Sequence, residues 1–212
     1  MIEIVFLAML AGFIALRLVS VLGRRTGEEK PVRDGFPGEP PVPPRMAEKR
    51  PAGRGFGGEW PAVVREPFQA IAQADRNFDP DDFLNKSQAA YRHILEAFWR
   101  GDRAELRPYV ADEVLAQFEQ VLDARAADGL NVENSLISVD RAEYVSAVLD
   151  GAMAEIAVRF DARISALTRN AAGAVIEGAP GETLETHDVW TFSRNTHAAD
   201  PVWLLTATDT EE

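Results

Sequence analysis

The side chains best suited to chemistry in this sequence are one aspartate and two tyrosines. Asp188 lies in a run of alternating apolar and polar residues, and Tyr91 and Tyr144 lie in two other segments rich in apolar residues. An aspartate base beside a hydrogen-bonding tyrosine can move a proton next to a carbonyl group. The same residues suit a structural role, in which Asp188 satisfies a neighbouring strand or turn and the tyrosines are core rings with hydrated hydroxyls. Both interpretations stay open at this point.

The three histidines do not have the spacing of a metal site. His93 lies in a helical segment beside Ile94 and reads as a surface or boundary residue, and His197 lies in a predicted loop. His187 and Asp188 are neighbours on a predicted strand, so their side chains point to opposite faces and cannot bind one ion together. The chain has no cysteine, which excludes disulfides, thiolate zinc sites, iron–sulfur clusters and cysteine nucleophiles. We therefore expect neither a metal nor a cofactor.

The composition is that of a globular protein with an acidic C-terminal part. Hydrophobic residues make up 46% and charged residues 26% of the 212 residues, and the net charge is −12. Residues 61–212 hold 27 of the 34 acidic residues but only 13 of the 22 basic ones. Because nucleic-acid binding depends on lysine and arginine neutralising phosphates, this balance argues against a nucleic-acid partner.

Residues 1–25 are predicted to form a transmembrane anchor helix. The segment from Ile4 to Leu22 has 19 residues and a single charge, Arg17. At the helical rise of about 1.5 Å per residue it is about 28 Å long, close to the thickness of the hydrocarbon core. The apolar residues that we assign to the anchor are Ile4, Phe6, Leu10, Phe13, Leu16 and Leu22.

The charges beside this segment predict its orientation. Glu3 precedes it and Arg24 and Arg25 follow it, whereas a cleaved signal peptide carries positive charge before its apolar run. Because positive residues stay on the cytoplasmic side, Arg24 and Arg25 predict a single-pass protein whose C-terminal part is cytoplasmic. An alternative is an amphipathic helix that lies on the membrane with Arg17, Ser20 and Arg24 facing water.

Residues 26–61 are predicted to form a disordered tether. Proline dominates residues 37–44 and glycine dominates residues 53–58, and no periodic apolar face survives between them. Such a segment buries too little apolar surface to offset the entropy of ordering. A flexible tether of this length reaches roughly 30–36 Å. Proline-rich segments also dock onto aromatic grooves, which is the alternative role.

The rest of the chain reads as helices followed by strands. Apolar residues recur every three or four positions in predicted helices at 63–75, 80–100, 103–110 and 113–128, with Asp79 and Asp112 as candidate caps. After Gly129 the period becomes two, and predicted strands cover 135–141, 143–149, 153–163, 174–177, 184–194 and 202–208. Asp150-Gly151 suits a hairpin turn. This order predicts an α+β fold with helices packed on one face of a curved antiparallel sheet.

The sequence of these segments resembles the Tim44-like domain family. The helical residues that carry the likeness are Phe83, Leu84, Ala90, Tyr91, Ile94, Ala97, Phe98, Gly101, Asp102, Leu106, Phe118 and Gly129. Residues 154–160, 188–194 and 200–208 are similar to the sheet half of that domain. The likeness covers about residues 78–209. The family includes the C-terminal domain of the mitochondrial inner-membrane import-motor subunit, with relatives in α-proteobacteria.

This resemblance implies a fold, a location and a role. Residues 62–212 would form a nuclear-transport-factor-two-like cone with a large apolar pocket. With the anchor and the tether, the chain looks like the bacterial form of the family: an adaptor or scaffold at the cytoplasmic face of the inner membrane, without catalysis, linked to protein translocation or membrane-protein biogenesis. Its partner would be a protein or an acyl lipid. The mitochondrial protein has a long charged region where this chain has a short tether, so chaperone recruitment does not carry over.

The cone suggests two candidate surfaces and one alternative function. Candidate residues to line the pocket, which also read as ordinary core residues, are Tyr91, Leu95, Phe160, Trp190 and Trp203. Because an acidic domain repels anionic lipids, a lipid or partner surface needs a basic patch, for which Arg100, Arg103 and Arg107 are the candidates. The same fold class hosts enzymes of the ketosteroid-isomerase type, so the alternative is a membrane-tethered enzyme that uses a polar group in the pocket.

Overall fold

The computed structural model describes residues 60–198 and 202–210. The predicted anchor and all but the last two residues of the predicted tether lie outside these ranges. Over the described ranges, no helix combines the length and the apolar character needed to cross a membrane.

Local capping signals set the limits of the long helix α3, Pro80–Arg100. The Asp79 side chain accepts a hydrogen bond from the backbone N–H of Asp82 at 3.0 Å, and Pro80 occupies the first helical position. Gly101 ends the helix with a left-handed φ of 74°, a conformation that favours glycine. The residues buried along α3 are Pro80, Phe83, Ser87, Ala90, Tyr91, Ile94 and Ala97. This face is the one that the period of three and four predicts.

Three shorter helices flank α3. Helix α2, Ala62–Ala74, buries Val64, Phe68 and Ile71. Helix α4, Arg103–Leu106, begins at the predicted cap, since Asp102 accepts a hydrogen bond from the N–H of Glu105 at 3.0 Å. It is shorter than predicted, because Pro108 cannot donate a helical hydrogen bond. Helix α5, Asp112–Ala127, includes Asp112 as its first residue, so the prediction of Asp112 as its cap was wrong.

The main sheet has four antiparallel strands. They are β2 (Ser135–Asp150), β3 (Met153–Ser165), β6 (Leu184–Asn195) and β7 (Leu204–Thr210), in the order β2-β3-β6-β7. The predicted strands at 135–141 and 143–149 are one strand, β2. Its pairing with β3 shifts register between Val139 and Arg141 and again between Tyr144 and Ser146. These bulges move side chains from one face to the other and so interrupt the alternation in sequence.

A second, smaller sheet follows the order β1-β4-β5. Its strands are β1 (Asn131–Val132), β4 (Leu167–Arg169) and β5 (Val175–Gly178). Gly178 has a φ of 73°, and a Cβ atom there would lie 2.0 Å from the carbonyl oxygen of Ala166. Only glycine therefore fits where β5 closes against the start of β4.

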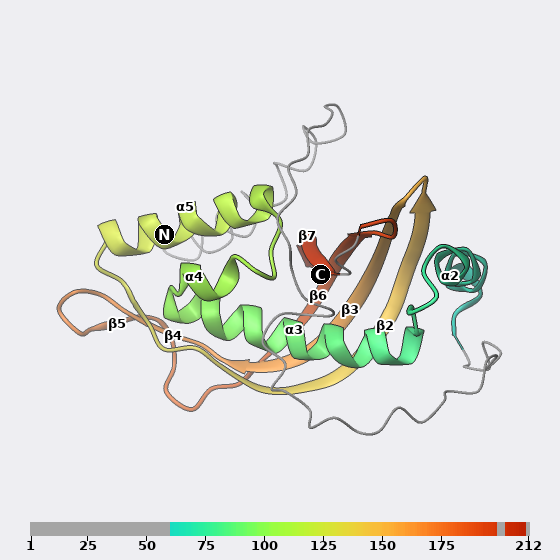
Figure 1. The fold of residues 1–212 in the computed structure, drawn as a ribbon. Helices are drawn as coiled ribbons and strands as arrows, with labels where there is room; N and C mark the ends of the chain where they lie inside the picture. The colour runs from blue at the N-terminus through green and yellow to red at the C-terminus, as the bar shows by residue number, and fades with distance from the viewer. Residues whose placement is uncertain (1–59, 199–201, 211–212) are drawn as a thin grey trace, which may run out of the picture. The chain divides into compact units, whose positions relative to one another are not determined.

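The helices lie on one side of the main sheet, which bends around α3 (Figure 1). Helix α2 packs against β2, α3 crosses β2 and β3, and α5 approaches β7. Two backbone hydrogen bonds of 2.9 Å, from Leu205 to Tyr109 and from Ala111 to Leu205, join β7 to the segment between α4 and α5. The fold is α+β with helices on one face of an antiparallel sheet, as predicted.

Candidate functional site

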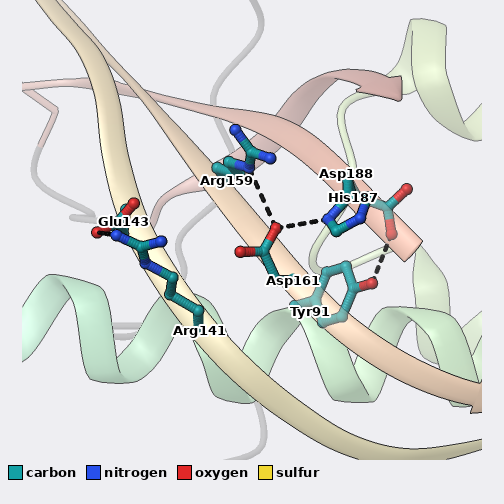
Figure 2. A network of polar contacts seen from close by, with 7 residues as sticks. All are labelled: Tyr91, Arg141, Glu143, Arg159, Asp161, His187 and Asp188. Carbon is teal, nitrogen blue, oxygen red and sulfur yellow. Dashed lines mark hydrogen bonds and ion pairs between the residues drawn. The ribbon is translucent and has the colours of Figure 1, made fainter. Parts of the chain in front are cut away.

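A tyrosine and an aspartate meet between α3 and β6. The Tyr91 hydroxyl donates a hydrogen bond of 2.6 Å to Oδ2 of Asp188 (Figure 2). Tyr91 is completely buried, whereas Asp188 is partly exposed near the end of β7, where the Thr210 hydroxyl lies 3.5 Å from its Oδ1. Two of the three residues that the sequence singled out for proton chemistry, Tyr91 and Asp188, are therefore in direct contact.

Burial dominates the titration of this pair. It raises the pKa of the Asp188 carboxyl above the ordinary value of 3.8, and the hydrogen bond from Tyr91 acts in the opposite direction. Burial also raises the pKa of the Tyr91 phenol, and the negative charge of Asp188 adds to that effect. Tyr91 therefore stays protonated and serves as the donor. The carboxyl group keeps its proton more readily than an exposed aspartate would.

Tyr144 does not join this site. Its hydroxyl donates a hydrogen bond to the carbonyl oxygen of Pro80, at the first turn of α3. Its ring packs against Phe68 with centroids 4.7 Å apart and stacks near Phe83 at 6.2 Å. Tyr144 thus ties β2 to the middle of α2 and to the N-terminal end of α3, and it makes no contact with Asp188 in the described structure.

The candidate pocket residues fall into two groups. The Tyr91 ring stacks on Phe160 at 4.4 Å and contacts Trp190 at 4.6 Å, so these three form one aromatic cluster beneath α3. Leu95 follows Tyr91 by one turn of α3 and is partly exposed. Trp203 lies in an adjoining group of rings, 4.7 Å from Phe83, and Phe192 connects this group to Trp190.

The outer face of the main sheet carries a row of paired charges. His187 points away from the Tyr91–Asp188 pair, and its Nδ1 lies 2.8 Å from Oδ1 of Asp161 (Figure 2). Arg159 donates to the same oxygen at 3.1 Å. The hydrogen bond with His187, and then the contacts with Arg159, hold the pKa of Asp161 below its ordinary value. His187 and Asp188 thus face opposite sides of β6, as the alternation along a strand predicts.

The other two histidines have different neighbours. His93 lies on α3, with its Nε2 3.4 Å from Glu105 and its ring 4.4 Å from that of Tyr109. His197 is exposed in the turn after β6. In the described part of the chain, no three His, Asp or Glu side chains come together in a way that would hold a metal ion.

The three candidate surface arginines each face an acidic side chain. Arg100 pairs with Glu105, Arg103 pairs with Asp123 at 2.5 Å, and Arg107 lies 3.5 Å from Glu119. These pairs connect α3 to α4 and α4 to α5. The sequence analysis did not show that acids neutralise these arginines.

Sequence reasoning also missed a buried ion pair at the other end of the sheet. Nη1 of Arg194 on β6 lies 2.8 Å from Oδ2 of Asp75, just after α2, and both side chains are less than a tenth exposed. A signal was present, because Arg194 follows Trp190 and Phe192 at the spacing of inward-facing positions on a strand.

The Asp188 and Asp161 carboxyl groups predict opposite pH dependences. In the folded state Asp188 holds its proton more tightly than in the unfolded state, so its contribution to stability falls as pH rises from about 4 towards its folded pKa. We expect Asp188→Asn, whose amide oxygen still accepts from Tyr91, to match or exceed the wild type at pH 7 and to lose that advantage at pH 4.

Asp161→Asn is the matched control on the other face of the sheet. The lowered pKa of Asp161 means that its charged carboxylate stabilises the fold. This stabilisation is present at pH values above the ordinary aspartate pKa of 3.8, and it is lost as the pH falls through the lower pKa of the folded state. This variant should therefore be less stable than the wild type at pH 7, and the difference should shrink as pH falls below the ordinary aspartate pKa of 3.8. Urea unfolding midpoints measured from pH 3 to pH 8 test both variants, and parallel curves for the two would contradict the assignment.

Comparison with known proteins assigns the chain to a family. A model of the Tim44-like domain matches residues 64–210. The human mitochondrial import inner membrane translocase subunit TIM44 is 24% identical over 155 residues, which are 70% of this chain and 34% of that protein. A probable TIM44 counterpart of Caenorhabditis elegans is 24% identical over 67% of this chain and 34% of its own length. The chain thus spans about a third of the length of these relatives.

Another relative matches from end to end. An uncharacterized protein of Rickettsia prowazekii is 22% identical over 96% of this chain and 95% of its own length. Among solved structures, the intermembrane space region of the chloroplast protein ARC6 aligns with 60% of this chain and 95% of that chain, at a TM-score of 0.42 and 11% identity. The family model covers most of the chain, and the chain therefore belongs to the Tim44-like domain family, as the residues of its helical and sheet halves predicted.

Proposed function

We propose that this protein is a non-enzymatic adaptor that presents its Tim44-like domain at the cytoplasmic face of a bacterial inner membrane. The family match over residues 64–210 carries the proposal, and the mitochondrial relatives are by name subunits of an inner membrane translocase. Residues 1–25 anchor the protein, residues 26–61 tether the domain, and the domain binds a protein or an acyl chain. Its role lies in protein translocation or membrane-protein biogenesis.

The proposed binding surfaces are the pocket of a nuclear-transport-factor-two-like cone and the arginine side of the helical layer. Tyr91, Phe160 and Trp190 supply the aromatic wall of the pocket, with Leu95 towards its opening. Arg100, Arg103 and Arg107 already share their charge with acids. Their surface therefore suits a polar protein partner better than an anionic lipid, which would compete with those acids.

The alternative function, a tethered enzyme of the ketosteroid-isomerase-like class, rests on Asp188 and its raised pKa. The geometry favours the adaptor. The hydroxyl that would stabilise a substrate oxyanion is already donated to the carboxylate that would act as the base. Asp188→Asn separates the two functions, because it would abolish proton transfer by an enzyme and leave an adaptor intact.

Cell fractionation tests the proposed anchoring and orientation. We expect the full-length protein to stay with the membrane after a carbonate wash and a variant lacking residues 2–23 to become soluble. In intact spheroplasts, added protease should leave residues 61–212 uncut, and it should digest them once the membrane is opened. Retention of the shortened variant in washed membranes, or digestion in intact spheroplasts, would contradict the proposal.

A further inference from the structure

Helix α2 binds the rest of the domain through one row of side chains. Val64, Phe68 and Ile71 follow one another at steps of four and three residues, so they share one face of the helix, and all three are completely buried. Asp75, four residues further on, ends the helix and is 7% exposed. Apolar anchors at this spacing are typical of a helix that lies in a groove of a partner protein.

The surface that receives this row is called the α2 seat below. It consists of Phe78, Tyr144 and Arg194. The Phe68 ring lies 5.6 Å from that of Phe78 and 4.7 Å from that of Tyr144, and Oδ2 of Asp75 lies 2.8 Å from Nη1 of Arg194. The seat has support that does not involve α2, because the Phe83 ring of α3 lies 6.2 Å from both seat rings. We therefore expect the seat to keep its shape when α2 leaves it.

Helix α2 has few local signals that stabilise it as a helix. Pro61 precedes it without a side-chain cap, no acidic residue lies in its first turn, and no basic residue lies in its last turn. Pro67 lies inside it and cannot donate a hydrogen bond to the carbonyl oxygen of Val63. It packs mainly against β2, apart from α4 and α5 (Figure 1). A helix that depends on its packing in this way belongs to the parts of a fold that open first.

We propose that α2 is a displaceable cover over a helix-binding site, and that this site takes an amphipathic helix of a partner protein with an acidic residue at the end of its apolar face. The rings of the seat suit apolar anchors. Arg194 requires a carboxylate, because a buried guanidinium group that loses its partner is costly. The inference goes beyond the surfaces proposed above, and it rests on the adaptor function in that it requires a protein partner.

Amide hydrogen exchange on the full-length protein in detergent tests whether α2 opens by itself. We expect amides of residues 65–74 to become accessible at least about 100-fold more often than those of β3, because local opening costs less than global unfolding. Equal protection of α2 and β3 would overturn the inference, since α2 would then be an inseparable part of the core.

A peptide supplied in trans tests whether the seat binds a helix. The probe is a fluorescein-labelled peptide of residues 61–77, and its binding to the full-length protein is followed by fluorescence anisotropy. Because only the open state binds, the apparent Kd falls as the open fraction rises. Gln69 is exposed on α2, so we expect Gln69→Gly to lower the apparent Kd about threefold and Gln69→Pro to lower it about 100-fold. Gln120→Gly, at an exposed position of α5, is the matched control and should leave it unchanged.

Substitutions in the peptide test the chemistry of the partner. Phe68→Ala and Asp75→Ala in the peptide should each weaken binding about tenfold or more, as the loss of a buried anchor does. Glu66→Ala, at an exposed position, should bind like the unchanged peptide. The inference is overturned if the peptide does not bind the Gln69→Pro protein, if that protein is unfolded, or if all peptides bind equally.

Exchange of α2 between two copies of the chain would give the same peptide result. Light scattering distinguishes the two occupants, and a wild-type dimer that Gln69→Pro abolishes would overturn the assignment to a foreign helix. Membrane fractionation does not depend on α2. A failure of this inference is therefore seen separately from a failure of the proposed anchoring.

Discussion

Asp75→Ala is expected to destabilise the domain by about 3–5 kcal/mol, the usual cost of breaking a buried ion pair by removing one partner. Oδ2 of Asp75 lies 2.8 Å from Nη1 of Arg194 in an ion pair, and its Oδ1 accepts a hydrogen bond from the backbone N–H of Asn77 at 3.0 Å. Arg194 is only 8% exposed, so the variant leaves a positive charge in the interior without its carboxylate. Urea unfolding followed by tryptophan fluorescence measures the loss.

Two further variants separate the buried charge from other effects of the substitution. Asp82→Ala removes an exposed carboxylate that lies 3.3 Å from the Lys86 ammonium group. The loss of this surface ion pair should lower the free energy of unfolding by about 0.5 kcal/mol or less. The double variant Asp75→Leu with Arg194→Met removes both charges and should recover most of the stability, because an apolar pair of similar volume replaces the ion pair. A cost for Asp75→Ala no greater than that for Asp82→Ala would show that the pair is not buried in solution.

The predictable parts of this fold are those with local signals. Helix α3 has an aspartate cap, a proline at its first position, an apolar face and a glycine at its end, and all of these lie within about 20 residues. The small sheet shows the opposite case. Strands β1 and β4 have two and three residues, which is too short for any period to emerge, and they exist because β4 pairs with both β1 and β5.

The candidate site was predictable in its residue types and not in its partners. Tyr91 and Asp188 were named as candidates from their residue types and the fold class, but the 2.6 Å contact between them depends on how α3 packs on the main sheet. The same limit applies to the arginines of α4, because Asp123 and Glu119 reach them only through the packing of α5 on α4. Sequence spacing describes one element at a time, whereas these neighbours are set by tertiary structure.

Trp203 differs from the other candidate pocket residues in a way that predicts a large effect. Its ring is 5% exposed, lies 4.7 Å from Phe83 and 6.1 Å from Phe78, and has the Arg194 guanidinium 5.9 Å above it. In a packed cluster of this kind, Trp203→Ala should cost about 3–5 kcal/mol, since the surrounding rings cannot collapse fully into the space. Trp99→Ala on α3 is the control, because Trp99 is only partly buried and should cost much less.

The energetic coupling between Trp203 and the Asp75–Arg194 ion pair tests this packing more directly than the single variants do. Because Arg194 touches both the Trp203 ring and Asp75, the losses from Trp203→Ala and Asp75→Ala should not add in the double variant. Trp99→Ala, which shares no partner with Asp75, should combine with Asp75→Ala additively. A ligand pocket at Trp203 predicts a different result: Trp203→Ala would keep the stability of the wild type and lose lipid that copurifies with the full-length protein. That outcome would move Trp203 out of the core and into the binding site.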